Sequence, residues 1–168
     1  VTIVHIAHPA KYLLLPIQEG SKEGQVKLET GSPADTEMDI RLAIDSVEYY
    51  VPFALTQDEG GATVTIRNVA ADALCWDSIK VSDTFDTTNR DKFRPLYHHT
   101  PLYGWMNDAN GLVYKDGEYH LYFQHNPYGS MWGNMHWGHS VSKDLVHWEH
   151  LDPAIARDTL GHIFSGSA

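Results

Sequence analysis

The chain has 168 residues, of which 42% are hydrophobic, and its formal net charge is -10. This size fits one or two small globular domains. The acidic balance argues against nucleic acid as a partner, because no basic stripe exists to neutralise phosphates. No apolar run approaches the roughly 20 residues that cross a bilayer, so no membrane span is expected. Cys75 is the only cysteine, which rules out an intrachain disulfide.

The first part of the chain is predicted to form an all-β, sandwich-like domain. Apolar and polar residues alternate most clearly in Thr63–Arg67 and Met38–Leu42. Turn-forming residues separate the strands, as in Gly31-Ser32-Pro33 and Asp58–Gly61. About seven short strands with frequent turns are typical of a sandwich. The expected strands are Val1–Ala7, Tyr12–Glu19, Gln25–Thr30, Glu37–Asp45, Glu48–Leu55, Ala62–Val69 and Ser78–Phe85.

The polar segment Asp86–Asp91 is predicted to be a domain boundary. It separates an accessory domain, residues 1–90, from a second domain, residues 91–168. The composition changes at this point, because four of the five tryptophans and nine of the eleven histidines lie in the second domain.

The second domain is predicted to contain four antiparallel strands, the number that makes one β-propeller blade. Asp116-Gly117 is typical of a type I′ hairpin, which would join a strand ending at Lys115 to one over Glu118–Gln124. The later strands are expected at His136–Ser142 and Trp148–Leu151, and His162–Ala168 would begin a second blade.

The stretch Trp105–Gly111 places the carboxylate of Asp108 between two carboxamides, Asn107 and Asn110. Asn, Asp and Gly tolerate tight and left-handed backbone states, so a turn or the start of a strand is predicted here. Turn chemistry alone would explain an isolated segment of this kind. The residues that follow are rich in Trp, His, Tyr and Gln, which build sugar pockets by ring stacking and hydrogen bonding. This context favours a functional interpretation.

Three segments agree in order and spacing with one known family: Trp105–Gly111, Trp132–Trp148 and Phe164–Ala168. They resemble glycoside hydrolase family 32, the β-fructosidases, which include invertases, inulinases and levanases. The family usually has proline where Ala109 stands, a change that frees φ but removes no reactive group. The resemblance implies a five-bladed β-propeller. The chain would hold its first blade and the start of the second, preceded by the small β domain that some bacterial members carry.

The resemblance also implies a retaining mechanism with Asp108 as the nucleophile. Retaining glycosidases use two carboxyl groups about 5 to 5.5 Å apart, and neighbouring amide donors such as Asn107 stabilise the ionised form of a nucleophile. In the family, the acid/base glutamate lies beyond the equivalent of Ala168, so the chain alone is expected to be inactive. The carboxyl groups that follow the motif are interpreted as surface or turn residues: Asp116, Glu118, Asp144, Glu149, Asp152 and Asp158.

Five residues are expected to contact the fructosyl unit. The resemblance assigns hydrogen bonds to Asn107 and Gln124, an apolar wall to Trp132, and further contacts to Phe164 and Ser165 from the start of the second blade. Structural alternatives exist for these residues, such as a strand end for Gln124, interblade packing for Trp132 and a turn hydroxyl for Ser165. Their convergence on one carboxylate favours the binding roles.

No metal and no cofactor are predicted. His136 and His139 are spaced by three residues, and on a strand such residues point to opposite faces, so they are expected to be hydrogen-bonded packing residues. Ser165-Gly166-Ser167 lacks the G-x-S-x-G pattern and the strand-to-helix context of a serine nucleophile.

The leading hypothesis is therefore a β-fructofuranosidase acting on fructose-containing oligo- or polysaccharides. A fructosyltransferase and a non-catalytic fructan-binding fragment are the alternatives. The remainder of the propeller is expected from a C-terminal part beyond Ala168. A secreted, periplasmic or cell-surface location is expected, with any signal removed or never included.

Overall fold

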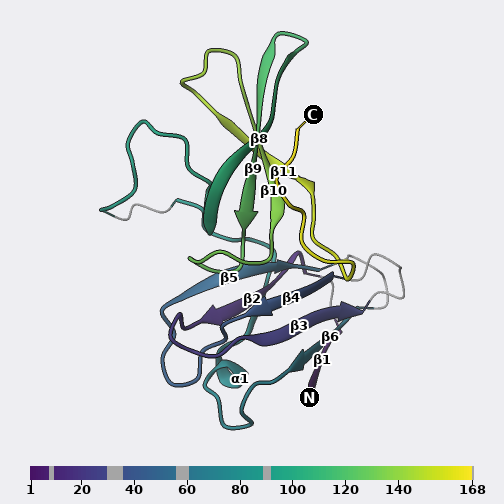
Figure 1. Cartoon of the computed structure of the whole chain (residues 1–168). Coiled ribbons are helices and arrows are strands. Elements are labelled where there is room, and N and C mark those ends of the chain that lie inside the picture. Colours follow the sequence, from purple (N-terminus) through teal and green to yellow (C-terminus); the bar gives the residue numbers. More distant parts are fainter. Residues whose placement is uncertain (8–9, 30–35, 56–60, 89–91, 168) are drawn as a thin grey trace. The chain divides into compact units, whose positions relative to one another are not determined.

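The computed structural model describes residues 1–7, 10–29, 36–55, 61–88 and 92–167. The chain divides into two compact units, Val1–Phe85 and Asp86–Ala168, and both are built from antiparallel strands (Figure 1). The division falls at the start of the predicted boundary segment. Residues 89–91 of that segment, and the predicted turns at 31–33 and 58–60, lie outside the described residues. No helix among the described residues is long and apolar enough to cross a membrane.

The first unit has two antiparallel sheets, as the alternating pattern predicts. One sheet has four strands in the order β1-β6-β3-β4, and the other has three in the order β5-β2-β7. All seven predicted strands are present within a few residues of the expected bounds: β1 (Thr2–Ile6), β2 (Tyr12–Ile17), β3 (Gly24–Glu29), β4 (Thr36–Ile40), β5 (Tyr49–Ala54), β6 (Ala62–Arg67) and β7 (Lys80–Ser82).

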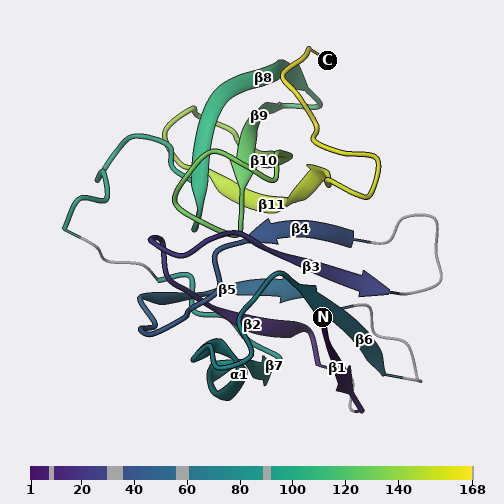
Figure 2. The same ribbon diagram turned by 60° about the horizontal axis from the view of Figure 1, so that its bottom comes forward.

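The core of the first unit is formed by one apolar face from each sheet. In the three-stranded sheet, Leu13 pairs with Phe53, and both side chains are fully buried. In the four-stranded sheet, Val26 lies opposite Ile66 on one side and Met38 on the other, all at most 1% exposed. Alternate residues along each strand share a face, so each sheet buries one such face. Figure 2 shows the strands of both sheets from a second direction.

A short helix, α1 (Cys75–Ser78), was not predicted from the sequence. It precedes β7 in the chain (Figure 2), and the Cys75 amide donates to the Ala43 carbonyl at 2.9 Å. Four residues are too few to show a helical period, which explains why the pattern could not reveal it. Cys75 is a free, fully buried thiol, and burial raises its pKa to about 11.

The second unit contains one four-stranded antiparallel sheet in the order β11-β10-β9-β8. The predicted hairpin is present, with φ of 52° at Asp116 and 88° at Gly117, as a type I′ turn requires. The strands are β8 (Trp105–Lys115), β9 (Glu118–Asn126), β10 (His136–Ser142) and β11 (Glu149–Ile155). A single sheet is one blade, so these residues do not close a propeller.

The segment that follows β11 returns along this sheet (yellow in Figure 1). Residues 162–167, which would begin a second blade, form no strand. They are nevertheless attached to the sheet, because the Ile163 amide donates to the Met135 carbonyl at 2.9 Å. The Met135 amide in turn donates to Nδ1 of His162 at 3.0 Å.

The two units differ in the polarity of their interiors. Among the described residues, the first unit buries Thr65 as its only polar side chain, whereas the second buries eight: Asn110, Gln124, His125, Asn126, Asn134, His136, Ser140 and Ser142. Buried polar groups destabilise a fold unless they are hydrogen-bonded. Buried polar side chains with a functional role are therefore expected in the second unit.

Candidate active site

Asp108 lies at a β-bulge within β8. Asn107 pairs with Gln124 and Ala109 pairs with Phe123, so Asp108 has no partner in β9. Its φ is 29°, an unusual value for a residue other than glycine. A bulge of this kind re-aims a side chain and is common beside active sites. The motif is thus inside a strand that begins at Trp105, earlier than the predicted run that starts at Leu112.

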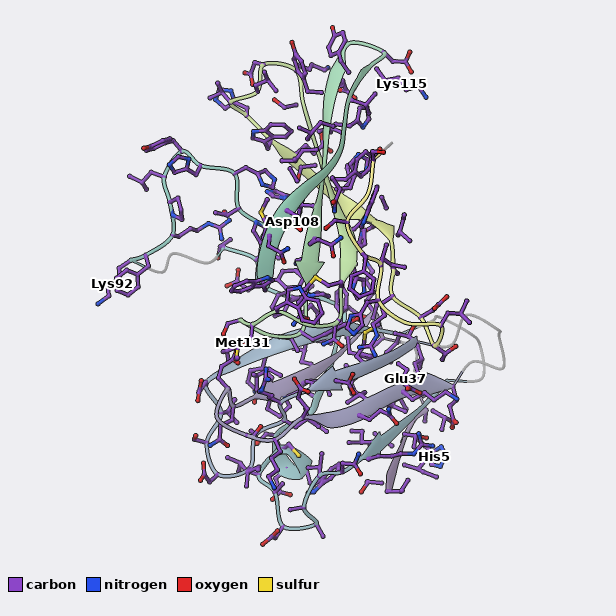
Figure 3. The ribbon with its side chains drawn as sticks, in the orientation of Figure 1. His5, Glu37, Lys92, Asp108, Lys115 and Met131 are labelled. Atoms are coloured by element: carbon purple, nitrogen blue, oxygen red, sulfur yellow. The ribbon has the colours of Figure 1, made fainter. Side chains whose placement is uncertain are left out.

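The Asp108 carboxylate is exposed and hydrogen-bonded. Ser165 Oγ donates to its Oδ2 at 2.8 Å, although the two residues are 57 positions apart in the sequence. The Ser165 hydroxyl, followed by the Asn107 side chain, lowers the pKa of Asp108. The carboxylate therefore remains ionised at neutral and mildly acidic pH. Figure 3 shows Asp108 part-way along β8, away from the hairpin tip where Lys115 lies.

The amide of Asn107 is oriented by the tryptophan that begins the motif. Trp105 Nε1 donates to Asn107 Oδ1 at 2.8 Å. This bond fixes the orientation of the amide, and its nitrogen, the only donor of the side chain, hydrogen-bonds the Asp108 carboxylate. The indole of Trp105 thus has a structural role that the sequence did not predict.

Gln124 lies beside Asn107 in the sheet, but it is not open to solvent. It pairs with Asn107 in β8 and with Trp137 in β10, so the three side chains share one face of the sheet. Only 2% of Gln124 is exposed. Its Nε2 is buried and has no hydrogen-bond partner among the described residues. An unsatisfied buried donor lowers the stability of the fold. An acceptor that reached this amide would therefore form a hydrogen bond with it.

Trp132 and Phe164 are joined through a histidine. Trp132 stacks on His162 with ring centroids 5.5 Å apart, and His162 contacts Phe164 at 6.0 Å. Trp132 is 53% exposed and Phe164 is 66% exposed, so both rings offer apolar surface. Phe164 precedes Ser165, the residue that contacts Asp108, which connects this aromatic row to the carboxylate.

A hollow lies elsewhere on the same sheet. It measures about 380 Å³ and is lined by residues around the turn between β10 and β11, including Glu118, Asp144 and Trp148, but not by Asp108. Two of its charged side chains pair with each other, since Lys143 Nζ lies 3.9 Å from a carboxylate oxygen of Glu118. Asp144 accepts hydrogen bonds from the His147 side chain and backbone. These contacts lower the pKa of Asp144 and indicate a turn-stabilising role.

The histidines of this unit mainly contact one another and the aromatic rings. Nδ1 of His120 lies 3.0 Å from Nε2 of His139, and His139 stacks on Tyr122 with centroids 4.4 Å apart. His136 and His139 lie on opposite faces of β10, since their partners in β9 are His125 and Tyr122. The described residues contain no group of three or more His, Cys, Asp or Glu side chains that could hold a metal ion.

Two known families match consecutive parts of the chain. Residues 1–97 match a family described as a domain of unknown function (DUF4980). Residues 98–168 match the N-terminal domain of glycosyl hydrolases family 32. The first match covers more than half of the chain, so the chain belongs to that family of unknown function. The match to family 32 covers the rest of the chain, which is less than half of it. The family 32 part includes Asp108 and every residue expected to contact the sugar.

The family 32 relatives are much longer than this chain. The levanase of Bacillus subtilis (strain 168) is 59% identical over 88 residues, which are 52% of this chain and 13% of that protein. The extracellular exo-inulinase of Aspergillus awamori is 49% identical over 81 residues, which are 45% of this chain and 15% of that protein. The crystal structure of exo-inulinase from Aspergillus awamori matches with 48% sequence identity and a TM-score of 0.43. The match covers 47% of this chain and 16% of the exo-inulinase chain.

Proposed function

We propose that this chain contributes the nucleophile of a retaining β-fructosidase. The proposal depends chiefly on Asp108, an exposed carboxylate at a bulge whose pKa is lowered by Ser165 and Asn107. A nucleophilic carboxylate must be ionised at the working pH, and this environment favours the ionised form. The names of the relatives, levanase and exo-inulinase, support fructans as the substrate class; sucrose is the other candidate.

In the proposed reaction, Asp108 attacks the anomeric carbon of a β-fructofuranosyl unit while the leaving oxygen takes a proton from an acid. This step forms a covalent fructosyl-enzyme and releases the rest of the sugar. Water, deprotonated by the same group acting as base, then attacks the anomeric carbon and frees Asp108. None of the carboxyl groups after the motif is among the groups that shift the pKa of Asp108. The acid/base is therefore proposed to come from the remaining blades.

Binding of the sugar is proposed to involve residues on both sides of the carboxylate. Asn107 and Ser165 already contact Asp108 and would orient it relative to the sugar ring. The exposed rings of Trp132 and Phe164 would pack on the apolar face of the furanose. The buried amide of Gln124 would donate to a sugar hydroxyl once its acceptor enters the site. An extracellular location is proposed, in keeping with the name of the Aspergillus exo-inulinase.

The proposal is tested with the extended protein, meaning this chain continued by the remaining blades of its propeller. We expect the extended protein to release fructose from levan, inulin or sucrose, and proton NMR of the first product to show retained anomeric configuration. The 168-residue chain alone should release none, because the acid/base is proposed to lie outside it. An inverted first product, or hydrolysis by the chain alone at a rate similar to that of the extended protein, would contradict the proposal.

A further inference from the structure

The short segment 164–166 has no strand of its own, yet it is fixed at both ends. At one end, Trp137 Nε1 donates to the Phe164 carbonyl at 3.0 Å. At the other, the Gly166 amide donates to Asn110 Oδ1 at 3.3 Å, and the Gly111 amide donates to the Gly166 carbonyl at 3.3 Å. Ser165 lies between these attachments and donates to Asp108. The position of its hydroxyl therefore depends on them.

Trp137 also packs directly on this segment. A Cβ added to Gly166 would lie 3.2 Å from Cζ2 and 3.5 Å from Cη2 of the Trp137 indole. The indole therefore contacts the glycine backbone with its ring and holds Phe164 with its N–H. Trp137 belongs to β10, where it pairs with Gln124 on one side and with Ile155 on the other. It is thus anchored in the interior of the sheet.

Asn110 is anchored just as firmly. It is 1% exposed and pairs with Tyr122 of β9, two positions beyond the bulge. Its Nδ2 is buried and has no partner among the described residues, an arrangement that costs stability. A leucine of similar size would avoid this cost. The amide of Asn110 serves as an acceptor, because its Oδ1 accepts a hydrogen bond from the Gly166 backbone N–H.

We propose that Asn110 and Trp137 are positioning residues that act on Asp108 through Ser165. They hold the backbone of 164–166 so that the Ser165 hydroxyl meets the Asp108 carboxylate. The functional meaning of this arrangement rests on the proposed role of Asp108 as the nucleophile. The groups that hydrogen-bond this carboxylate and lower its pKa are the Ser165 hydroxyl, the Asn107 side chain and the backbone N–H of Asp108. None of them is charged, and Ser165 has the largest effect, so displacing Ser165 is expected to raise the pKa of Asp108.

The test is a carbon-13 NMR titration of the Asp108 carboxyl in the 168-residue chain. Loss of a donor to the ionised form raises a carboxyl pKa. We expect Ser165→Ala to raise it, and Asn110→Leu and Trp137→Phe each to reproduce most of that rise. In the Ser165→Ala background, the two substitutions should add nothing, because residues that act through a shared partner are not additive. A residue with only a general structural role would not show this dependence on Ser165.

Ser142→Ala is the matched control. Ser142 Oγ donates to Asp144 at 3.1 Å near the turn after β10, so this variant removes the same kind of bond elsewhere on the sheet and should leave the pKa of Asp108 unchanged. The proposal fails if Trp137→Phe, with a native amide spectrum elsewhere, leaves that pKa unchanged. It also fails if its effect adds to that of Ser165→Ala. If Asn110→Leu does not fold, Trp137→Phe decides. The titration requires no hydrolysis, so its outcome is separate from that of the proposed function.

Discussion

Asp108→Asn should abolish fructan hydrolysis by the extended protein. Asparagine has nearly the same size and its amide oxygen still accepts the Ser165 hydrogen bond, but it does not form the fructosyl-enzyme. Removing an essential catalytic group typically lowers kcat on the order of 10⁴-fold or more. The measurement is the rate of fructose release from levan, inulin and sucrose at saturating substrate.

Asp144→Asn provides the comparison. Asp144 is also an exposed, hydrogen-bonded aspartate of lowered pKa in the same sheet, but its partners are His147 and the turn backbone. The extended protein with this change should retain its kcat. If Asp108→Asn cleaved fructans as fast as the unchanged protein, Asp108 would not be the nucleophile and the proposed mechanism would be wrong.

Gly104→Ala should destabilise the second unit by about 3 kcal/mol, because it combines backbone strain with a steric clash. Gly104 has φ of 80°, and an added Cβ would lie 2.1 Å from the Asn126 carbonyl oxygen. The chain has little room to relax. The carbonyl of Tyr103 is bound to His125 at 2.9 Å, and Trp105 pairs with Asn126. Urea unfolding followed by tryptophan fluorescence measures the loss, since four of the five tryptophans lie in this unit.

Gly117→Ala separates the two causes. Gly117 has φ of 88°, close to that of Gly104, but an added Cβ would meet nothing within 4 Å. Only the strain of a left-handed backbone remains, which costs about 1 kcal/mol. Equal losses in the two variants would mean that the clash with Asn126 contributes nothing. Because Gly104 precedes the motif, its replacement should also disturb the bulge at Asp108.

The sequence predicted the strands well because their signals are local. Alternation in Thr63–Arg67 indicated β6, and the Asp116-Gly117 pair indicated the β8–β9 hairpin from its turn chemistry alone. The bulge at Asp108 could not be predicted in this way. It is a mismatch of register between two strands, and a pattern within one strand does not specify how its partner is aligned.

The sequence indicated which residues form the candidate site, but it did not indicate how these residues contact one another. The motif and its resemblance to family 32 indicated Asp108, Asn107 and Ser165, and the geometry of these three supports the proposed site. The burial of Gln124 could not be foreseen, because a polar residue at the end of a strand is usually solvated. No role was predicted for Trp137 or Asn110, although both lie in the segments that resemble family 32. Their contacts join positions 27 and 56 residues apart, which periodicity does not reveal.

The buried thiol of Cys75, the first residue of α1, allows the unfolding of the two units to be observed separately. Thiol reagents attack the thiolate, and Cys75 is fully buried with a pKa of about 11, so alkylation requires the first unit to open. Tryptophan emission comes mainly from the second unit. The natural chain thus carries one chemical and one optical reporter, and the order in which its halves unfold can be followed without an added label.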